Sequence, residues 1–140
     1  MEFVLDNSVS MRWLFGDGSH EDLAYADRVL EYMTEPGSVA RVPSLWSLEV
    51  ANVITRAEAR AFVSEARTSK FLALLQEMAI RADPETFERA LDTTLALARR
   101  HALSAYDAAY LELAMRKGIP LATLDAGLCR AVREAQATRL

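Results

Sequence analysis

Short apolar stretches alternate with longer helical patterns, and this alternation is the feature that most limits what the chain can fold into. Three or four stretches have the pattern of buried strands, at residues 2–5, 39–42, 78–82 and 121–124. Helical patterns lie between and after them, at residues 20–34, 45–61, 64–77, 84–101, 104–117 and 126–137. Strands this short, separated by helices, predict right-handed crossovers and a parallel sheet covered on both faces. We therefore expect an α/β fold.

The chain has no internal repeat, no low-complexity tract and no long linker, and short turn signals such as Asp83-Pro84 separate its segments. Its 140 residues predict a single domain over residues 1–140. Apolar runs are far shorter than the ~20 residues of a membrane span, so we expect no membrane segment. The N-terminus lacks the pattern of a secretory signal, and the single cysteine, Cys129, excludes an internal disulfide. These features predict a cytoplasmic protein.

The charged residues give a mixed indication about nucleic acid. The net charge of −4 argues mildly against broad binding to a phosphate backbone. Almost all of the basic residues are arginines, however, and the guanidinium group binds phosphate with two hydrogen bonds better than lysine does. Arginines that could line a groove are Arg12, Arg56, Arg60, Arg99, Arg100 and Arg116. Helical arginines usually face solvent, so the sequence does not identify which of them would contact RNA.

Two aspartates follow predicted strands directly. Asp6 comes after the strand at residues 2–5, and Asp125 comes after the strand at residues 121–124. In open parallel sheets, ligands bind beyond the carboxyl ends of the strands, where the strand order reverses. Asp6 and Asp125 are therefore candidates for a site that is assembled from distant parts of the chain.

Each acidic residue of interest also has a structural interpretation. Asp6 and Asp125 could each cap the helix that follows, and Ser104 with Asp107 has the spacing of a capping box. Glu49 could be an exposed helical glutamate. Taken singly, the structural interpretation is the simpler one for each of these residues.

Taken together, the acids interrupt apolar stripes in a way that caps do not explain. Asp107 shares a helical stripe with Tyr110 and Leu111, and Asp125 and Glu49 lie on similar stripes. A buried carboxylate is costly unless it finds a partner, and the sequence offers no matching lysines. Mg²⁺ or Mn²⁺ would supply the missing charge and prefers oxygen ligands. With only two histidines and one cysteine in the chain, a zinc site is a poor fit.

Four segments resemble the PIN-domain family, and most closely the VapC-like ribonuclease toxins. The segments are V-L-D-N-S-V around Asp6, P-S-L-W-S-L-E-V-A-N around Glu49, L-S-A-Y-D-A-A-Y around Asp107 and I-P-L-A-T-L-D ending at Asp125. No single segment is specific, but together, in this order and spacing, they form a strong signature over nearly the whole chain.

The resemblance implies a three-layer α/β/α sandwich with a short-stranded parallel sheet, forming one PIN-like domain over residues 1–140. It implies a Mg²⁺- or Mn²⁺-dependent endoribonuclease, a homodimer, and a small antitoxin partner that occludes the site. Asp6, Glu49, Asp107 and Asp125 would be the catalytic and metal-binding acids. Ser8 and Thr123 would not bind the metal themselves but would orient the metal-binding carboxylates. Ordinary turn hydroxyls are an equally good explanation of Ser8 and Thr123.

Two other classes of function remain open from the sequence. A phosphoryl-accepting, receiver-like domain would also use an acidic pocket, but it needs a paired acid next to Asp6 and a lysine near the phosphate. Asn7 and Ser8 follow Asp6, and no predicted strand leads into Lys117. The other class is a non-catalytic domain that binds RNA or a partner protein, whose acids are only caps and which Mn²⁺ would not stabilise.

Overall fold

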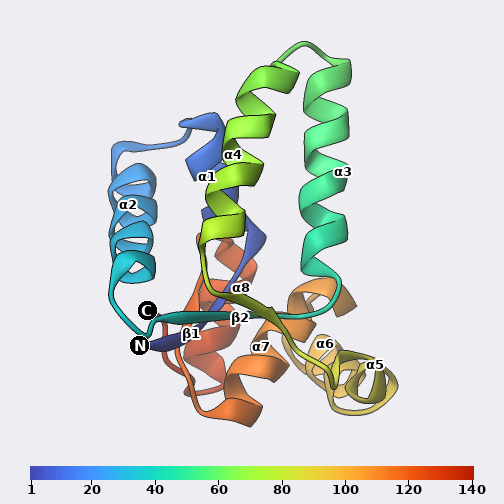
Figure 1. Cartoon of the computed structure of the whole chain (residues 1–140). Helices are drawn as coiled ribbons and strands as arrows, with labels where there is room; N and C mark the ends of the chain where they lie inside the picture. Colours follow the sequence, from blue (N-terminus) through green and yellow to red (C-terminus); the bar gives the residue numbers. More distant parts are fainter.

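The computed structural model describes residues 1–140 and contains one sheet of four strands (Figure 1). The strands are β1 (Glu2–Leu5), β2 (Val39–Val42), β3 (Ile80–Ala82) and β4 (Leu121–Ala122). Their order across the sheet is β3-β2-β1-β4, and every pairing is parallel. The predicted α/β fold with a short-stranded parallel sheet is therefore confirmed.

Helices make all the connections between the strands. They are α1 (Asn7–Phe15), α2 (His20–Thr34), α3 (Trp46–Ala59), α4 (Glu65–Glu77), α5 (Thr86–Arg89), a π-helical turn η1 (Ala90–Thr94), α6 (Leu95–His101), α7 (Ala105–Lys117) and α8 (Ala126–Glu134). None of them combines the length and the apolar character needed to cross a bilayer.

The helices form layers on the two sides of the sheet. In Figure 1, α1 to α4 lie above the sheet, and α3 and α4 project from it as a long hairpin, whereas α5 to α7 lie below. Helix α7 packs against β1 and β4, and α1 packs against α2, α3 and α4. Three residues of β1, Phe3, Val4 and Leu5, are completely buried, because this central strand is covered on both faces.

The strand order places a topological switch beside β1. The chain runs from β1 outward through β2 to β3, and then returns to add β4 on the other side of β1. The Asp6 N–H donates to the carbonyl of Ala122 at 3.0 Å, so the carboxyl ends of β1 and β4 lie side by side. In sheets of this kind the crevice at the switch is the usual place for a ligand.

Strand β4 is shorter than the predicted strand at residues 121–124. The reason is that side-chain hydroxyls take the backbone N–H groups beyond Ala122. The N–H of Leu124 donates to Ser8 Oγ at 2.9 Å, and the N–H of Asp125 donates to Thr123 Oγ1 at 3.0 Å. The sheet ladder therefore ends two residues early, and the chain turns toward β1.

The other boundaries differ from the predicted ones in two places that the periodicity does not reveal. The helix predicted at residues 84–101 is broken by the π-helical turn η1 into α5 and α6. The strand predicted at residues 78–82 begins only at Ile80. The sequence predicts no range for α1. The helices α2, α3, α4, α7 and α8 lie within three residues of their predicted ends, and the predicted helix at residues 20–34 matches α2 at both ends.

The last residues of the chain extend the sheet edge. The Leu121 N–H donates to the Thr138 carbonyl at 2.9 Å, and the Leu140 N–H donates to the Leu121 carbonyl at 3.0 Å. Tyr25 of α2 donates its hydroxyl to the carbonyl of Leu140 at 2.9 Å. The two ends of the chain consequently lie close together (Figure 1).

Candidate active site at the carboxyl ends of β1 and β4

Asp6 is the most deeply placed acid of this region. It occupies the N-cap position of α1, but its side chain makes no capping hydrogen bond. Only 4% of the residue is exposed. The interpretation of Asp6 as a helix cap is therefore wrong, and another reason is needed for a carboxylate at this depth.

Two hydroxyl groups hold the Asp6 carboxylate. Ser8 Oγ donates to Asp6 Oδ2 at 2.5 Å, and Thr123 Oγ1 donates to the same oxygen at 2.8 Å. Thr123 follows β4 and Ser8 lies in the first turn of α1, so the two hydroxyls come from different elements. The other oxygen of Asp6, Oδ1, accepts no hydrogen bond from the protein. One face of the carboxylate is thus fixed, and the other is free to bind a ligand.

Asp125 performs the capping role that its position suggests. Its Oδ2 accepts from the N–H of Leu128 at 2.9 Å in the first turn of α8, while Oδ1 accepts no hydrogen bond. The cap leaves one carboxylate oxygen available, so capping and ligand binding are compatible in this residue.

Glu49 and Asp107 complete the group from α3 and α7. Both residues are partly buried. The hydroxyl of the fully buried Tyr110 donates to Glu49 Oε1, which leaves Oε2 without a hydrogen bond. Ser104 caps α7 by accepting the N–H of Asp107 at 3.0 Å, which is half of the predicted capping box. Glu49 is therefore not the exposed glutamate of the structural interpretation.

Three of the four acids have pKa values raised by burial and by the charge of another acid of the group. Burial raises the pKa of Asp6 to about 6, the hydroxyls of Ser8 and Thr123 oppose the rise, and the charges of Asp107 and Glu49 add to it. Burial and then repulsion by Asp125 raise the pKa of Asp107. The pKa of Glu49 is raised by burial and by Asp107, against the hydrogen bond from Tyr110. These repulsions link Asp6 with Glu49 and Asp107, and Asp107 with Asp125, so the acids lie near one another at this end of the sheet.

No basic side chain of the protein neutralises these four carboxylates. None of the four carboxylates forms an ion pair with a lysine, arginine or histidine. Free oxygens on Asp6, Glu49 and Asp125 are the hard donors that Mg²⁺ and Mn²⁺ prefer. No group of three or more His, Cys, Asp or Glu side chains is drawn together tightly enough to hold an ion as it stands. The donor set fits a divalent cation, and binding one would require side-chain rotation.

Three residues support the site in ways that the sequence does not predict. Tyr110 orients Glu49 across the gap between α7 and α3. The carbonyl of Thr123 accepts from Arg139 Nε at 3.1 Å and Nη2 at 2.9 Å. The N–H of Thr123 donates to the Tyr25 hydroxyl at 3.3 Å, and the guanidinium of Arg139 lies 4.3 Å from the centre of the Tyr25 ring. The Tyr110–Glu49 and Tyr25–Thr123 contacts join residues 61 and 98 positions apart, which local patterns cannot reveal.

The sequence matches the PIN domain over residues 3–134, nearly its whole length. The chain belongs to the PIN domain family. PIN domains are generally nucleases that usually use divalent metals, and they bind RNA and often pair with antitoxins. No curated protein matches this PIN domain in sequence.

A solved structure supports the fold independently. The crystal structure of PAE2754 from Pyrobaculum aerophilum is similar to this PIN domain with a TM-score of 0.65. The similarity covers 94% of this chain and 84% of that one, at 22% sequence identity. At this identity the likeness establishes the shared fold.

Proposed function

We propose that this PIN domain, as a single unit of residues 1–140, is a metal-dependent endoribonuclease. Asp6, Glu49, Asp107 and Asp125 are the proposed catalytic and metal-binding residues. A bound Mg²⁺ or Mn²⁺ would activate a water for attack on phosphorus and neutralise the charge that develops on the phosphate. The reaction breaks one P–O bond of the RNA backbone and adds the elements of water across it.

One observation carries this proposal. Asp6 is 4% exposed, has no cationic partner and has a pKa raised to about 6. A carboxylate buried in this way costs stability, and such groups are concentrated at functional sites. A divalent cation would remove the cost and at the same time supply the chemistry.

The surrounding residues have distinct roles in the proposed site. Ser8 and Thr123 hold Oδ2 of Asp6 and leave Oδ1 without a hydrogen bond, available to a metal ion. Tyr110 fixes Glu49 in the same way, with one oxygen engaged and one free. These hydrogen bonds keep the carboxylates oriented before the substrate arrives, which lowers the reorganisation needed in the transition state.

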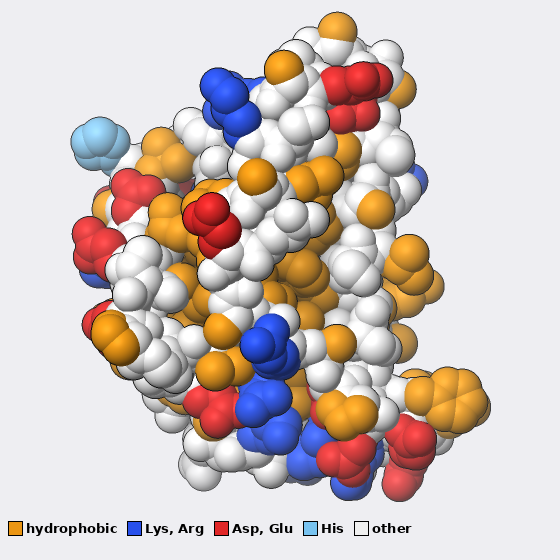
Figure 2. Space-filling model, in the orientation of Figure 1, with side chains coloured by type: hydrophobic (Ala, Val, Ile, Leu, Met, Phe, Trp, Pro, Cys, Tyr) orange, Lys and Arg blue, Asp and Glu red, His pale blue; other side chains and the backbone are white.

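The toxin role is the finer part of the proposal. We propose that a small antitoxin protein covers the acidic pocket and that the domain works as a homodimer. Large apolar side chains that are exposed near the start of α3 and on α5 and η1 support a protein partner: Leu48 (73% exposed), Phe87 (87%) and Leu91 (88%). The Ser44 N–H donates to Thr86 Oγ1, which joins these two regions. Figure 2 shows hydrophobic side chains protruding at the lower right, where α5 lies.

The decisive experiment is RNA cleavage by purified variants. Asp6→Asn and Asp107→Asn should each lower Mg²⁺- or Mn²⁺-dependent cleavage of a labelled RNA by at least about a hundredfold, the effect of removing one transition-state contact. EDTA should silence the wild-type protein. Melting curves should show that both variants remain folded.

Asp27→Asn is the matched control, because Asp27 is an exposed aspartate on α2 and forms no ion pair with another side chain. It should cleave RNA at the wild-type rate. Full cleavage by either Asp6→Asn or Asp107→Asn would remove the assignment of these acids. Stable labelling of Asp6 by acetyl phosphate would favour the receiver-like alternative instead.

A further inference from the structure

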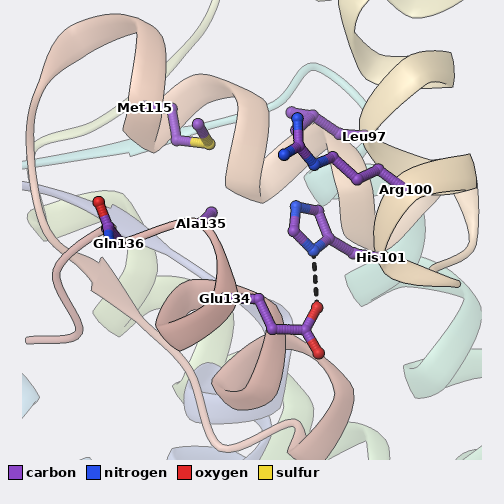
Figure 3. Close-up of a pocket in the computed structure, with 7 residues that line it drawn as sticks. All are labelled: Leu97, Arg100, His101, Met115, Glu134, Ala135 and Gln136. Atoms are coloured by element: carbon purple, nitrogen blue, oxygen red, sulfur yellow. Dashed lines mark hydrogen bonds and ion pairs between the residues drawn. The ribbon is translucent and has the colours of Figure 1, made fainter.

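A second pocket lies between α6, α7 and the end of α8, outside the acidic site (Figure 3). Its volume is about 370 Å³. Its lining residues are Leu97, Arg100, His101, Met115, Glu134 and Gln136, with Ala135. His101 is 6% exposed, so a buried titratable ring forms part of the wall.

The hydrogen bond to Glu134 determines that Nδ1 of His101 is protonated and sets the orientation of the ring. His101 Nδ1 lies 2.8 Å from Glu134 Oε2. An ionised carboxylate only accepts, so Nδ1 carries a proton. The same hydrogen bond lowers the pKa of Glu134, which keeps that carboxylate ionised. The ring is thereby locked in one orientation.

The other ring nitrogen, Nε2, has no partner in the protein. No hydrogen bond reaches it, and Figure 3 shows it turned away from Glu134 toward the interior of the pocket, on the side where Arg100 lies. In the doubly protonated imidazole ring, Nε2 is a hydrogen-bond donor. His101 is thus a residue more than nine-tenths buried whose Nε2 has no partner in the protein, which indicates a ligand.

The charges around the pocket select an anion. Arg100 contributes an exposed guanidinium from the same helix as His101, and the Gln136 side chain offers amide donors. Glu134 is the one acid of the lining, and it is shared between His101 and Arg130 Nε at 3.6 Å. Met115 from α7 is uncharged. Guanidinium and imidazolium donors together match the oxygens of a phosphate group.

We propose that the His101–Arg100 pocket binds a phosphate group, and that this phosphate belongs to the backbone of the RNA substrate. Residues 102–104 alone separate His101 from the start of α7, which carries Asp107. Helix α8 likewise runs from Asp125 to Glu134. The nine residues from Asp125 to Glu134 span about 14 Å along the helix, a separation that a single strand leaving the acidic site can bridge. The choice of RNA as the phosphate source rests on the proposed function, whereas the phosphate site itself does not.

The chain contains two histidines, so NMR of the imidazole groups tests the site directly. His20 is exposed at the start of α2 and serves as an internal reference. Inorganic phosphate, added at pH 6.5 without metal and at constant ionic strength, should shift the His101 ring signals saturably and leave those of His20 unchanged. Arg100→Ala should weaken this binding at least about tenfold. Arg99→Ala, an exposed neighbour that does not line the pocket, should leave it unchanged.

A second titration distinguishes the source of the phosphate. A short single-stranded RNA, added in EDTA so that it is not cleaved, should shift the same His101 signals, and Arg100→Ala should again weaken the effect. A response to phosphate but not to RNA would overturn the assignment to the substrate. No response to either, or an equal response in Arg100→Ala, would overturn the site itself. Binding of RNA by a domain that fails to cleave it would leave this site standing and sink the nuclease proposal.

Discussion

Two buried aspartates at the ends of strands differ in the partners that the fold gives their carboxylates. Asp6 follows β1 and Asp83 follows β3, and each is 4% exposed. Asp83 Oδ2 pairs with Arg116 Nη2 at 2.5 Å, and Arg116 also binds Glu112 at 2.8 Å and Glu85 at 3.0 Å. Asp6 has only hydroxyl partners and the repulsion of other acids.

The difference separates a structural ion cluster from a candidate active site. At Asp83 the protein supplies its own cation, so the cluster is complete and ties the end of β3 to α7. At Asp6 the cation is missing from the protein, which leaves a place for one from solution. A buried acid alone therefore says little about function, and the partner that the fold provides is the informative feature.

Substitution of Arg116, the cation of the Asp83 cluster, should have the largest effect on stability. Arg116→Met leaves Asp83 and the 5% exposed Glu112 buried without a counter-charge. We expect a loss of about 3–5 kcal/mol in the free energy of unfolding, measured by urea denaturation. Asp6→Asn, which removes a charge that has no partner, should leave stability equal or higher. Equal losses of unfolding free energy in Arg116→Met and Asp6→Asn would show that the two aspartates do not differ in their need for a counter-charge.

The pH dependence of stability should reveal the missing cation at Asp6. The pKa of Asp6 is about 6 in the folded protein and 3.8 when unperturbed. A raised pKa favours the folded state at low pH, and this contribution is lost as the pH rises toward 6 and above. Relative to Asp6→Asn, the metal-free wild type should lose about 3 kcal/mol between pH 4 and pH 7, from roughly two pKa units.

The measurement is urea unfolding of both proteins in EDTA at the two pH values. Saturating Mn²⁺ should reduce the loss, because a bound cation stabilises the ionised carboxylate. Parallel curves for wild type and Asp6→Asn would contradict the raised pKa of Asp6.

The smallest expected effect concerns the hydroxyls that hold Asp6. Ser8→Ala removes a hydrogen bond that lowers the pKa of Asp6, so a larger fraction of the carboxylate is protonated at pH 6.5. Mn²⁺ affinity at that pH, measured by calorimetry, should fall roughly fivefold, the effect of about 1 kcal/mol. The affinity should recover at pH 8. Ser10→Ala, whose hydroxyl bonds only the Asn7 carbonyl, is the control, and an equal loss in it would rule out an orienting role.

The parts of the fold and site that the sequence predicts are those encoded by short segments. The strands and helices follow from periodicity, and Asp6 and Asp125 are recognisable because each directly follows an apolar stretch. The sequence places Tyr110 only on the apolar stripe that it shares with Asp107. It is buried, but the role of its hydroxyl depends on α3 lying opposite α7, which no local pattern encodes.

Residues whose meaning depends on a distant partner are the ones that sequence reasoning misjudges. The sequence marks Asp83 only as part of a turn and Arg116 as a possible RNA contact. Arg116 is instead largely buried in the ion cluster, with 15% of its side chain exposed. Thr123 and Ser8 could be simple turn hydroxyls by sequence, yet both meet on one oxygen of Asp6. Their roles follow from the sheet order, which is decided by packing of the whole chain.

The last residues form an isolated β-bridge with β4 and contact the acidic edge of the sheet indirectly. Arg139 donates two hydrogen bonds to the Thr123 carbonyl, and Leu140 is hydrogen-bonded to β4 and to Tyr25. A protease that trimmed residues 136–140 would loosen the peptide that presents Thr123 and Asp125 without touching an acid. Affinity tags and fusion partners are therefore better joined ahead of Met1, and even there with a flexible spacer, since both ends share one corner of the domain.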